Sequence, residues 1–158
     1  MRMTTVFQPL VGLALGALVV LAVLPRAEDI ALLLYPASRW LEINAVRVGS
    51  VAAGGSPRMT VERSINRPFR ATWTVSVRRM TRSGHTLVCT RHGDNDYRPG
   101  SVPPADTDLN WWLAVPPNEP CPPMAPGQYF VTIVWVIMAD GMPSRTVRAE
   151  SNVFEVTP

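Results

Sequence analysis

Two cysteines are the first side chains in this 158-residue chain whose type and spacing could do chemistry. Cys89 and Cys121 are its only cysteines, and an even pair is typical of a disulfide in an oxidising compartment. A bridge that closes a loop of about 33 residues stabilises a fold by roughly 3–4 kcal/mol on the chain-entropy model. We therefore predict a Cys89–Cys121 disulfide, with two buried free thiols as the alternative. The two histidines and two cysteines lack the close pairs typical of a zinc site.

Acidic residues gather in a second candidate site, a predicted polar loop over residues 91–108. The candidate ligands are Asp94, Asp96, Asp106, Asp108 and Asn110. The last three follow the D-x-D-x-N spacing that opens a calcium loop, in which alternate oxygens converge on the cation. The glycine and the late glutamate of an EF-hand are missing. Two interpretations stay open: a calcium site, or a solvated loop that holds no cofactor.

Known catalytic motifs are missing from the sequence. It contains no G-x-S-x-G, no H-E-x-x-H and no glycine-rich phosphate loop. An unmarked acid pair such as Asp94 with Asp108, near His92, is the remaining arrangement that could act on a substrate. We therefore expect a protein that is not an enzyme, with an envelope enzyme as an alternative.

Residues 6–24 form an almost uninterrupted apolar segment. As a helix, about 19 residues at ~1.5 Å each match the ~30 Å hydrocarbon core of a bilayer. Arg2 precedes the segment, whereas two acids offset Arg26 after it, so the N-terminus is expected in the cytoplasm. The residues after Leu24 make a poor signal-peptidase site. We predict that residues 1–27 are an uncleaved signal-anchor in contact with membrane lipid; a cleaved signal peptide is the alternative.

This orientation predicts a single-pass protein of a bacterial inner membrane, with its C-terminal domain in the periplasm. Residues 28–42 are expected to connect the anchor to that domain. The connector is either a short interfacial helix broken near Pro36 or a first strand packed on the domain.

From residue 43 to residue 158 the hydrophobic pattern changes to a period of two, interrupted by turn residues, which indicates β-strands. The expected strands are residues 43–51, 59–65, 71–79, 85–90, 109–115, 128–138 and 144–156. Seven short strands without a convincing helix predict a single all-β antiparallel sandwich. Its expected core residues are Trp73, Val75, Val77, Tyr129, Ile133 and Trp135. The strand over residues 128–138 is apolar on both faces and is expected at the centre of a sheet.

An interaction surface follows from the same alternation. If the odd-numbered residues of 128–138 face the core, the even-numbered apolar ones face away from it. The candidate contact residues are Phe130, Val134, Val136, Met138 and Trp112. An exposed apolar patch usually marks an interaction site; the alternative is that residues 30–40 or a loop cover it.

The segment APGQY at residues 125–129, leading into a strand, resembles the start of strand F in immunoglobulin-like and fibronectin type III-like domains. The resemblance covers roughly residues 43–157. It implies that the Tyr129 hydroxyl bonds back to the backbone and that Trp73 is a buried tryptophan of an earlier strand. Cys121 precedes Tyr129, so an antibody-type disulfide is not expected. The fold hosts many functions and implies no activity.

The basic residues are 15 arginines without a lysine, and the net charge of +3 is spread along the chain. This pattern does not favour a nucleic-acid partner. Two hypotheses remain besides an enzyme. The first is a non-catalytic module that binds another protein or a second copy of itself, for example as an accessory subunit of an envelope assembly. The second is a phage- or prophage-encoded structural or lysis-cassette protein.

Overall fold

The computed structural model describes residues 34–103, 107–113 and 121–158. Ala37–Pro158 form one compact unit, distinct from the unit that ends at Pro36. Within these three described ranges, no helix has the length and apolarity needed to cross a bilayer. The predicted span, residues 6–24, lies outside the described residues, as do residues 28–33 of the predicted connector.

The described part of the compact unit is all-β. Its strands are β1 (Leu41–Val48), β2 (Val51–Ala52), β3 (Met59–Ile65), β4 (Phe69–Thr81), β5 (Gly84–Tyr97), β6 (Gly127–Met138), β7 (Arg145–Glu150) and β8 (Phe154–Thr157). Two short helical segments accompany them: η1 (Ala37–Arg39) and α2 (Leu109–Leu113). The predicted strand over residues 59–65 is confirmed with the same bounds.

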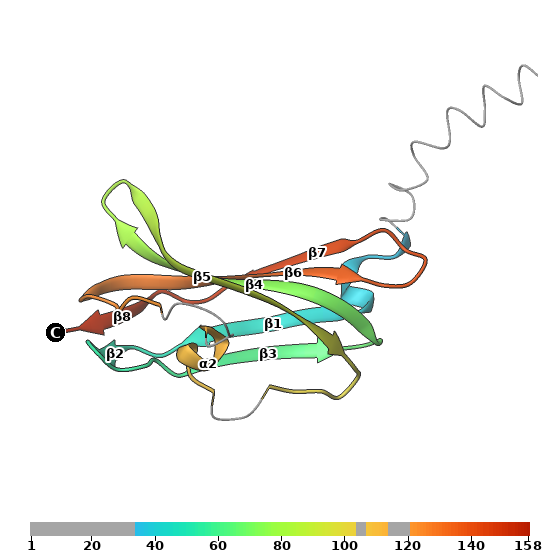
Figure 1. The fold of residues 1–158 in the computed structure, drawn as a ribbon, viewed down its shortest axis with the longest axis horizontal. Coiled ribbons are helices and arrows are strands. Elements are labelled where there is room, and N and C mark those ends of the chain that lie inside the picture. The colour runs from blue at the N-terminus through green and yellow to red at the C-terminus, as the bar shows by residue number, and fades with distance from the viewer. Residues whose placement is uncertain (1–33, 104–106, 114–120) are drawn as a thin grey trace, which may run out of the picture. The chain divides into compact units, whose positions relative to one another are not determined.

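These strands form two sheets, which Figure 1 shows on either side of a common interior. The small sheet is the antiparallel pair β1–β3, and the large sheet has the order β2-β8-β6-β4-β5. β6 pairs with β4 along one edge and with β8 and then β7 along the other. The predicted central position of this strand is therefore confirmed.

The core lies between the two sheets and takes the odd-numbered residues of β4 and β6. The register places Trp73 beside Trp135 and Val75 beside Ile133. Val75, Ile133 and Trp135 are fully buried. The small sheet closes the core with Leu41, Val46, Val48, Met59, Val61 and Ile65. Because successive side chains of a strand point to opposite faces, the even-numbered residues of β4 and β6 lie on the outer face of the large sheet.

Trp73 differs from the other expected core residues because it is only half-buried. It sits opposite Gly93 of β5, and a Cβ atom at Gly93 would lie 2.6 Å from Cζ2 of the indole. The indole therefore lies over a gap in β5 that only glycine leaves open.

β5 is longer than predicted, because it continues through Tyr97 where a polar loop was expected from Arg91. The sequence of this part is polar, yet Tyr97 ends the strand inside the core, stacked on Phe69 with ring centroids 4.9 Å apart. Arg63 of β3 lies over the same ring, 5.1 Å from its centroid. The stacking on Phe69 within the large sheet and the Arg63 contact from the small sheet hold the polar segment in the ladder with β4.

The electrostatics of this contact follow from its burial. Burial lowers the pKa of Arg63, and the negative charge that Tyr97 can carry partly offsets the effect. Burial raises the pKa of Tyr97, and the positive charge of Arg63 partly offsets that effect.

The predicted strand over residues 109–115 is wrong, since Leu109–Leu113 form the helix α2. The Asp108 carboxylate accepts a hydrogen bond of 2.8 Å from the backbone N–H of Trp111, which is the geometry of a helix N-cap. Leu109, Trp112 and Leu113 are buried, and their i, i+3, i+4 spacing puts them on one helical face.

The last predicted strand is divided into β7 and β8 by residues 151–153. Within this break, the side chain of Asn152 bonds the backbone of β1. Its Oδ1 accepts from Val48 N at 2.9 Å, and its Nδ2 donates to Val48 O at 3.0 Å. This amide links the end of the small sheet to the connection between two strands of the large one.

The compact unit begins before residue 43. Trp40 and Leu41 are buried, and Leu41 already pairs with Ile65 of β3. The end of the predicted connector is therefore the start of a strand packed on the domain, which was one of its two interpretations.

Tyr129 makes the hydrogen bond that the resemblance implied. Its hydroxyl donates to the carbonyl oxygen of Ala125 at 2.6 Å, and its ring stacks on Phe154. The bond fixes the turn that leads the chain into β6.

Removing this hydroxyl tests the contribution of the bond. We expect Tyr129→Phe to lower the free energy of unfolding by about 0.5–1.5 kcal/mol, because the ring stays and only one hydrogen bond is lost. Chemical denaturation followed by circular dichroism measures the change. Tyr129→Leu, which also loses the buried ring, should cost more, and equal stability of Tyr129→Phe and the native chain would contradict the expectation.

Candidate interaction surface

The outer face of the large sheet carries an apolar row along β6. We call this row the β6 row; it consists of Phe130, Val134, Val136 and Met138. Met138 is 41% exposed, and the other three are half-buried. They are partly covered because β4 and β7 flank them: Thr74 and Arg148 lie beside Val134, and Thr72 and Thr146 lie beside Val136.

Ion pairs lie at both margins of this face. On the β4–β5 side, Arg70 bonds Asp94 at 2.5 Å. On the β7 side, Arg148 bonds Glu150 at 2.6 Å. The Asp94 partner raises the pKa of the exposed Arg70 guanidinium. Each pair balances its own charge, so the margins beside Val134, Val136 and Met138 are polar and carry little net charge.

The predicted participation of Trp112 in this surface is wrong. Trp112 is only 7% exposed, whereas its neighbour Trp111 is 51% exposed. The helical geometry of α2 explains the difference, since residues 109, 112 and 113 share the buried face. The two indoles meet edge to face, with centroids 5.1 Å apart. The exposed aromatic of this pair is therefore Trp111.

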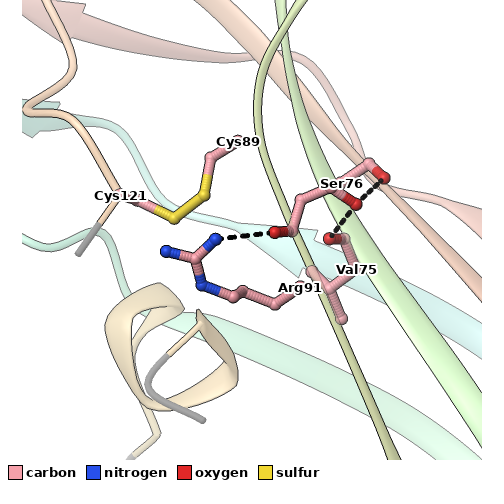
Figure 2. Close-up of a disulfide and its surroundings, with 6 residues drawn as sticks. Val75, Ser76, Cys89, Arg91 and Cys121 are labelled. Carbon is pink, nitrogen blue, oxygen red and sulfur yellow. Dashed lines mark hydrogen bonds between the residues drawn. A yellow bond between two sulfur atoms is a disulfide. The ribbon is translucent and has the colours of Figure 1, made fainter. Parts of the chain in front are cut away.

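Figure 2 shows the disulfide between Cys89 of β5 and Cys121, whose Cα atoms are 5.7 Å apart. The predicted disulfide is confirmed. It ties the middle of β5 to the segment that leads into β6, next to a bulge in β5 at Val88. Beside it, Arg91 donates to the Thr90 carbonyl at 2.8 Å.

A pocket of about 240 Å³ opens next to the disulfide. Its apolar lining comes from Val77 and Val88 of the large sheet, Leu113 of α2, and Met124. Asn110 is the polar side chain at its margin. The pocket holds no nucleophile–base pair and no acidic group among the residues described around it.

The candidate calcium ligands are separated by the fold. Asp94 and Asp96 lie on the outer face of the large sheet, opposite Thr72 and Arg70. The backbone of Asp108 forms an isolated β-bridge with Arg58, just before β3 of the small sheet, and its carboxylate caps α2. Across the ranges that the structure covers, no group of three or more histidine, cysteine or acidic side chains could hold a metal ion. Asp106 lies outside the described residues.

The same separation applies to the acid pair considered for catalysis. Asp94 bonds Arg70 on the large sheet, and Asp108 serves α2 near the small sheet. His92 pairs in register with Thr74, and the His85 ring contacts Phe130 edge to face at 5.4 Å. The fold does not assemble these side chains into one site.

Sequence reasoning missed the exposed side chains at the end of the β4–β5 hairpin. Met80 is 41% exposed and Leu87 is 50% exposed. The signal was present in the sequence, because the stretch between Glu62 and Asp94 contains seven arginines and no acid.

The chain matches no protein-family model, no curated protein and no solved structure.

Proposed function

We propose that this chain is a non-catalytic, membrane-anchored interaction module of the bacterial envelope, whose domain binds a protein partner in the periplasm. The domain would be an immunoglobulin-like or fibronectin type III-like sandwich. Its contact surface would be the outer face of the large sheet. The observation that carries the proposal is the β6 row, an apolar row that faces away from the core.

The charges around the row indicate what kind of partner fits. Arg70–Asp94 and Arg148–Glu150 are ion pairs within the chain, so the charges that flank the Val134–Met138 part of the row are compensated. Protein interfaces combine an apolar centre with a polar rim in this way. A partner with an apolar, nearly neutral surface therefore fits the face better than a polyanion does.

The membrane location rests on the apolar segment of residues 6–24. The confirmed disulfide supports a domain on the oxidising side of that membrane, where disulfides form and persist. An accessory role in a larger envelope assembly agrees with a small domain that offers a binding face. The partner that binds this face is either another protein of the envelope or a second copy of the chain.

Affinity capture of the full chain from detergent-solubilised membranes tests this proposal. We expect Val136→Asp to reduce the yield of the co-purified partner at least about tenfold, because an unpaired buried charge costs more than 1.4 kcal/mol. Val136 points away from the core, so the variant should fold. Thr60→Asp is the matched control, since it adds the same charge at an exposed position of β3 on the small sheet. Equal capture by both variants would contradict the proposed surface.

A further inference from the structure

The β4–β5 hairpin projects beyond the rest of the large sheet, as Figure 1 shows. β6 accompanies β4 only as far as Arg79, which pairs with Tyr129. Past this point the two arms of the hairpin pair only with each other, up to Thr81 and Gly84. Residues 79–87 are all exposed, and we call them the hairpin tip. The tip is therefore available to a surface outside the domain.

The hairpin tip and its base carry positive charge without any acid. Arg78, Arg79 and Arg82 belong to this part of the chain, and the nearest acids in sequence are Glu62 and Asp94. The Arg79 guanidinium donates to the Pro126 carbonyl at 2.7 Å, so it is held against the domain. Arg82 lies in the turn itself, where nothing of the described sheet covers it. The tip thus attracts anions.

Two apolar side chains stand on the same face of this cationic hairpin. Arg78 pairs with Leu87, and Met80 pairs with His85 two residues further along, so all four side chains lie on one face. Leu87 is 50% exposed and Met80 is 41% exposed. His85 leans on Phe130, which connects this face to the end of the β6 row. Cations and exposed apolar groups therefore meet at one end of the sheet.

We propose that the hairpin tip contacts an anionic lipid surface. Arginines near an anionic bilayer gain electrostatic attraction, and neighbouring apolar side chains insert at the boundary of headgroups and acyl chains. A protein partner is a poorer fit, because a stable protein interface needs about 800 Å² on each side and nine residues of a narrow hairpin present less. The inference goes beyond the proposed function, since it uses a different part of the domain and a different ligand.

Photo-crosslinking in lipid nanodiscs tests this contact with the full chain. Ser83→p-benzoylphenylalanine places the reactive group in the turn, and mass spectrometry counts lipid adducts. We expect adducts in discs that contain phosphatidylglycerol and about fivefold fewer in discs of phosphatidylcholine alone. Adding Arg82→Gln should also reduce the yield about fivefold, which is the contribution expected of one arginine near an anionic surface.

Arg98→Gln is the matched control, because it removes the same charge just beyond the opposite end of β5. The yield should stay unchanged in this variant. Equal yields in both lipids, an equal loss with Arg98→Gln, adducts to protein instead of lipid, or no lipid adduct in the anionic discs would each overturn the proposal. None of these results depends on Val136, so failure here is distinct from failure of the proposed protein-binding face.

Discussion

Trp135→Ala should lower the free energy of unfolding by about 3–5 kcal/mol, the range for removing a large aromatic side chain from a packed core. Trp135 is fully buried in β6, between Trp73 of β4 and Val147 of β7 in the ladder. The truncation leaves a cavity that these neighbours fill only in part. Both sheets border this part of the core, so the loss affects the whole sandwich.

Chemical denaturation of the full chain in detergent, followed by far-ultraviolet circular dichroism, measures this change. Trp111→Ala is the matched control, because Trp111 is half exposed on α2. Apart from the loss of the ring contact with Trp112, this substitution should lower the free energy of unfolding by less than about 0.5 kcal/mol. If the two substitutions shift the denaturation midpoint equally, the core is assigned to the wrong face of β6.

The second large effect is expected from the disulfide. The double variant Cys89→Ala with Cys121→Ala should be less stable than the native chain by about 3–4 kcal/mol, the value for a loop of this size on the chain-entropy model. The two cysteines are 32 positions apart, and the loop between them includes α2 and the end of β5. Without the bridge this loop is free in the unfolded chain.

Adding a reductant distinguishes the effect of losing the disulfide bond from the effect of replacing the two cysteine side chains. Dithiothreitol should lower the denaturation midpoint of the native chain and leave the midpoint of the double variant unchanged. A native chain whose midpoint does not respond to reductant would contradict the stabilising role of Cys89–Cys121.

The sequence predicts best where the alternation of side chains is strong. From residue 69 to residue 77, β4 is apolar at every odd position and mostly polar between, so the inward faces of Val75 and Val77 follow from the pattern. β6 is apolar on both faces, and the odd-numbered residues assigned to its core face, Ile133 and Trp135, are buried in the structure. The short motif before β6 was sufficient to anticipate the hydrogen bond of Tyr129. The two cysteines allowed only one pairing, so their disulfide required no knowledge of topology.

The prediction failed where tertiary contacts override a weak local pattern. The polar sequence of residues 91–97 predicts a loop. In the structure these residues stay in β5 because Tyr97 is buried against Phe69 and Arg63, which are distant in sequence. Residues 109–113 are too few to distinguish the two periodicities. Asp108 caps the helix, whereas the sequence pattern made the same carboxylate only a candidate calcium ligand.

The surface was predicted only in part for a related reason. The β6 row follows from alternation, and its outward position agrees with the half-buried and exposed side chains of the structure. Trp112 was placed on this surface by the strand periodicity of a segment that is helical. The hairpin tip was missed because the net charge of +3 hides a local excess of arginine that the fold brings to one end of the sheet.

Photo-crosslinking in living cells tests the protein-binding face most directly. Val136→p-benzoylphenylalanine puts the reactive group in the β6 row of the full chain, and Thr60→p-benzoylphenylalanine puts it on the small sheet. We predict a discrete protein adduct from position 136 and none from position 60, with a mass that distinguishes a second copy of the chain from another protein. Absence of an adduct at position 136, or the same adducts from both positions, would contradict the account.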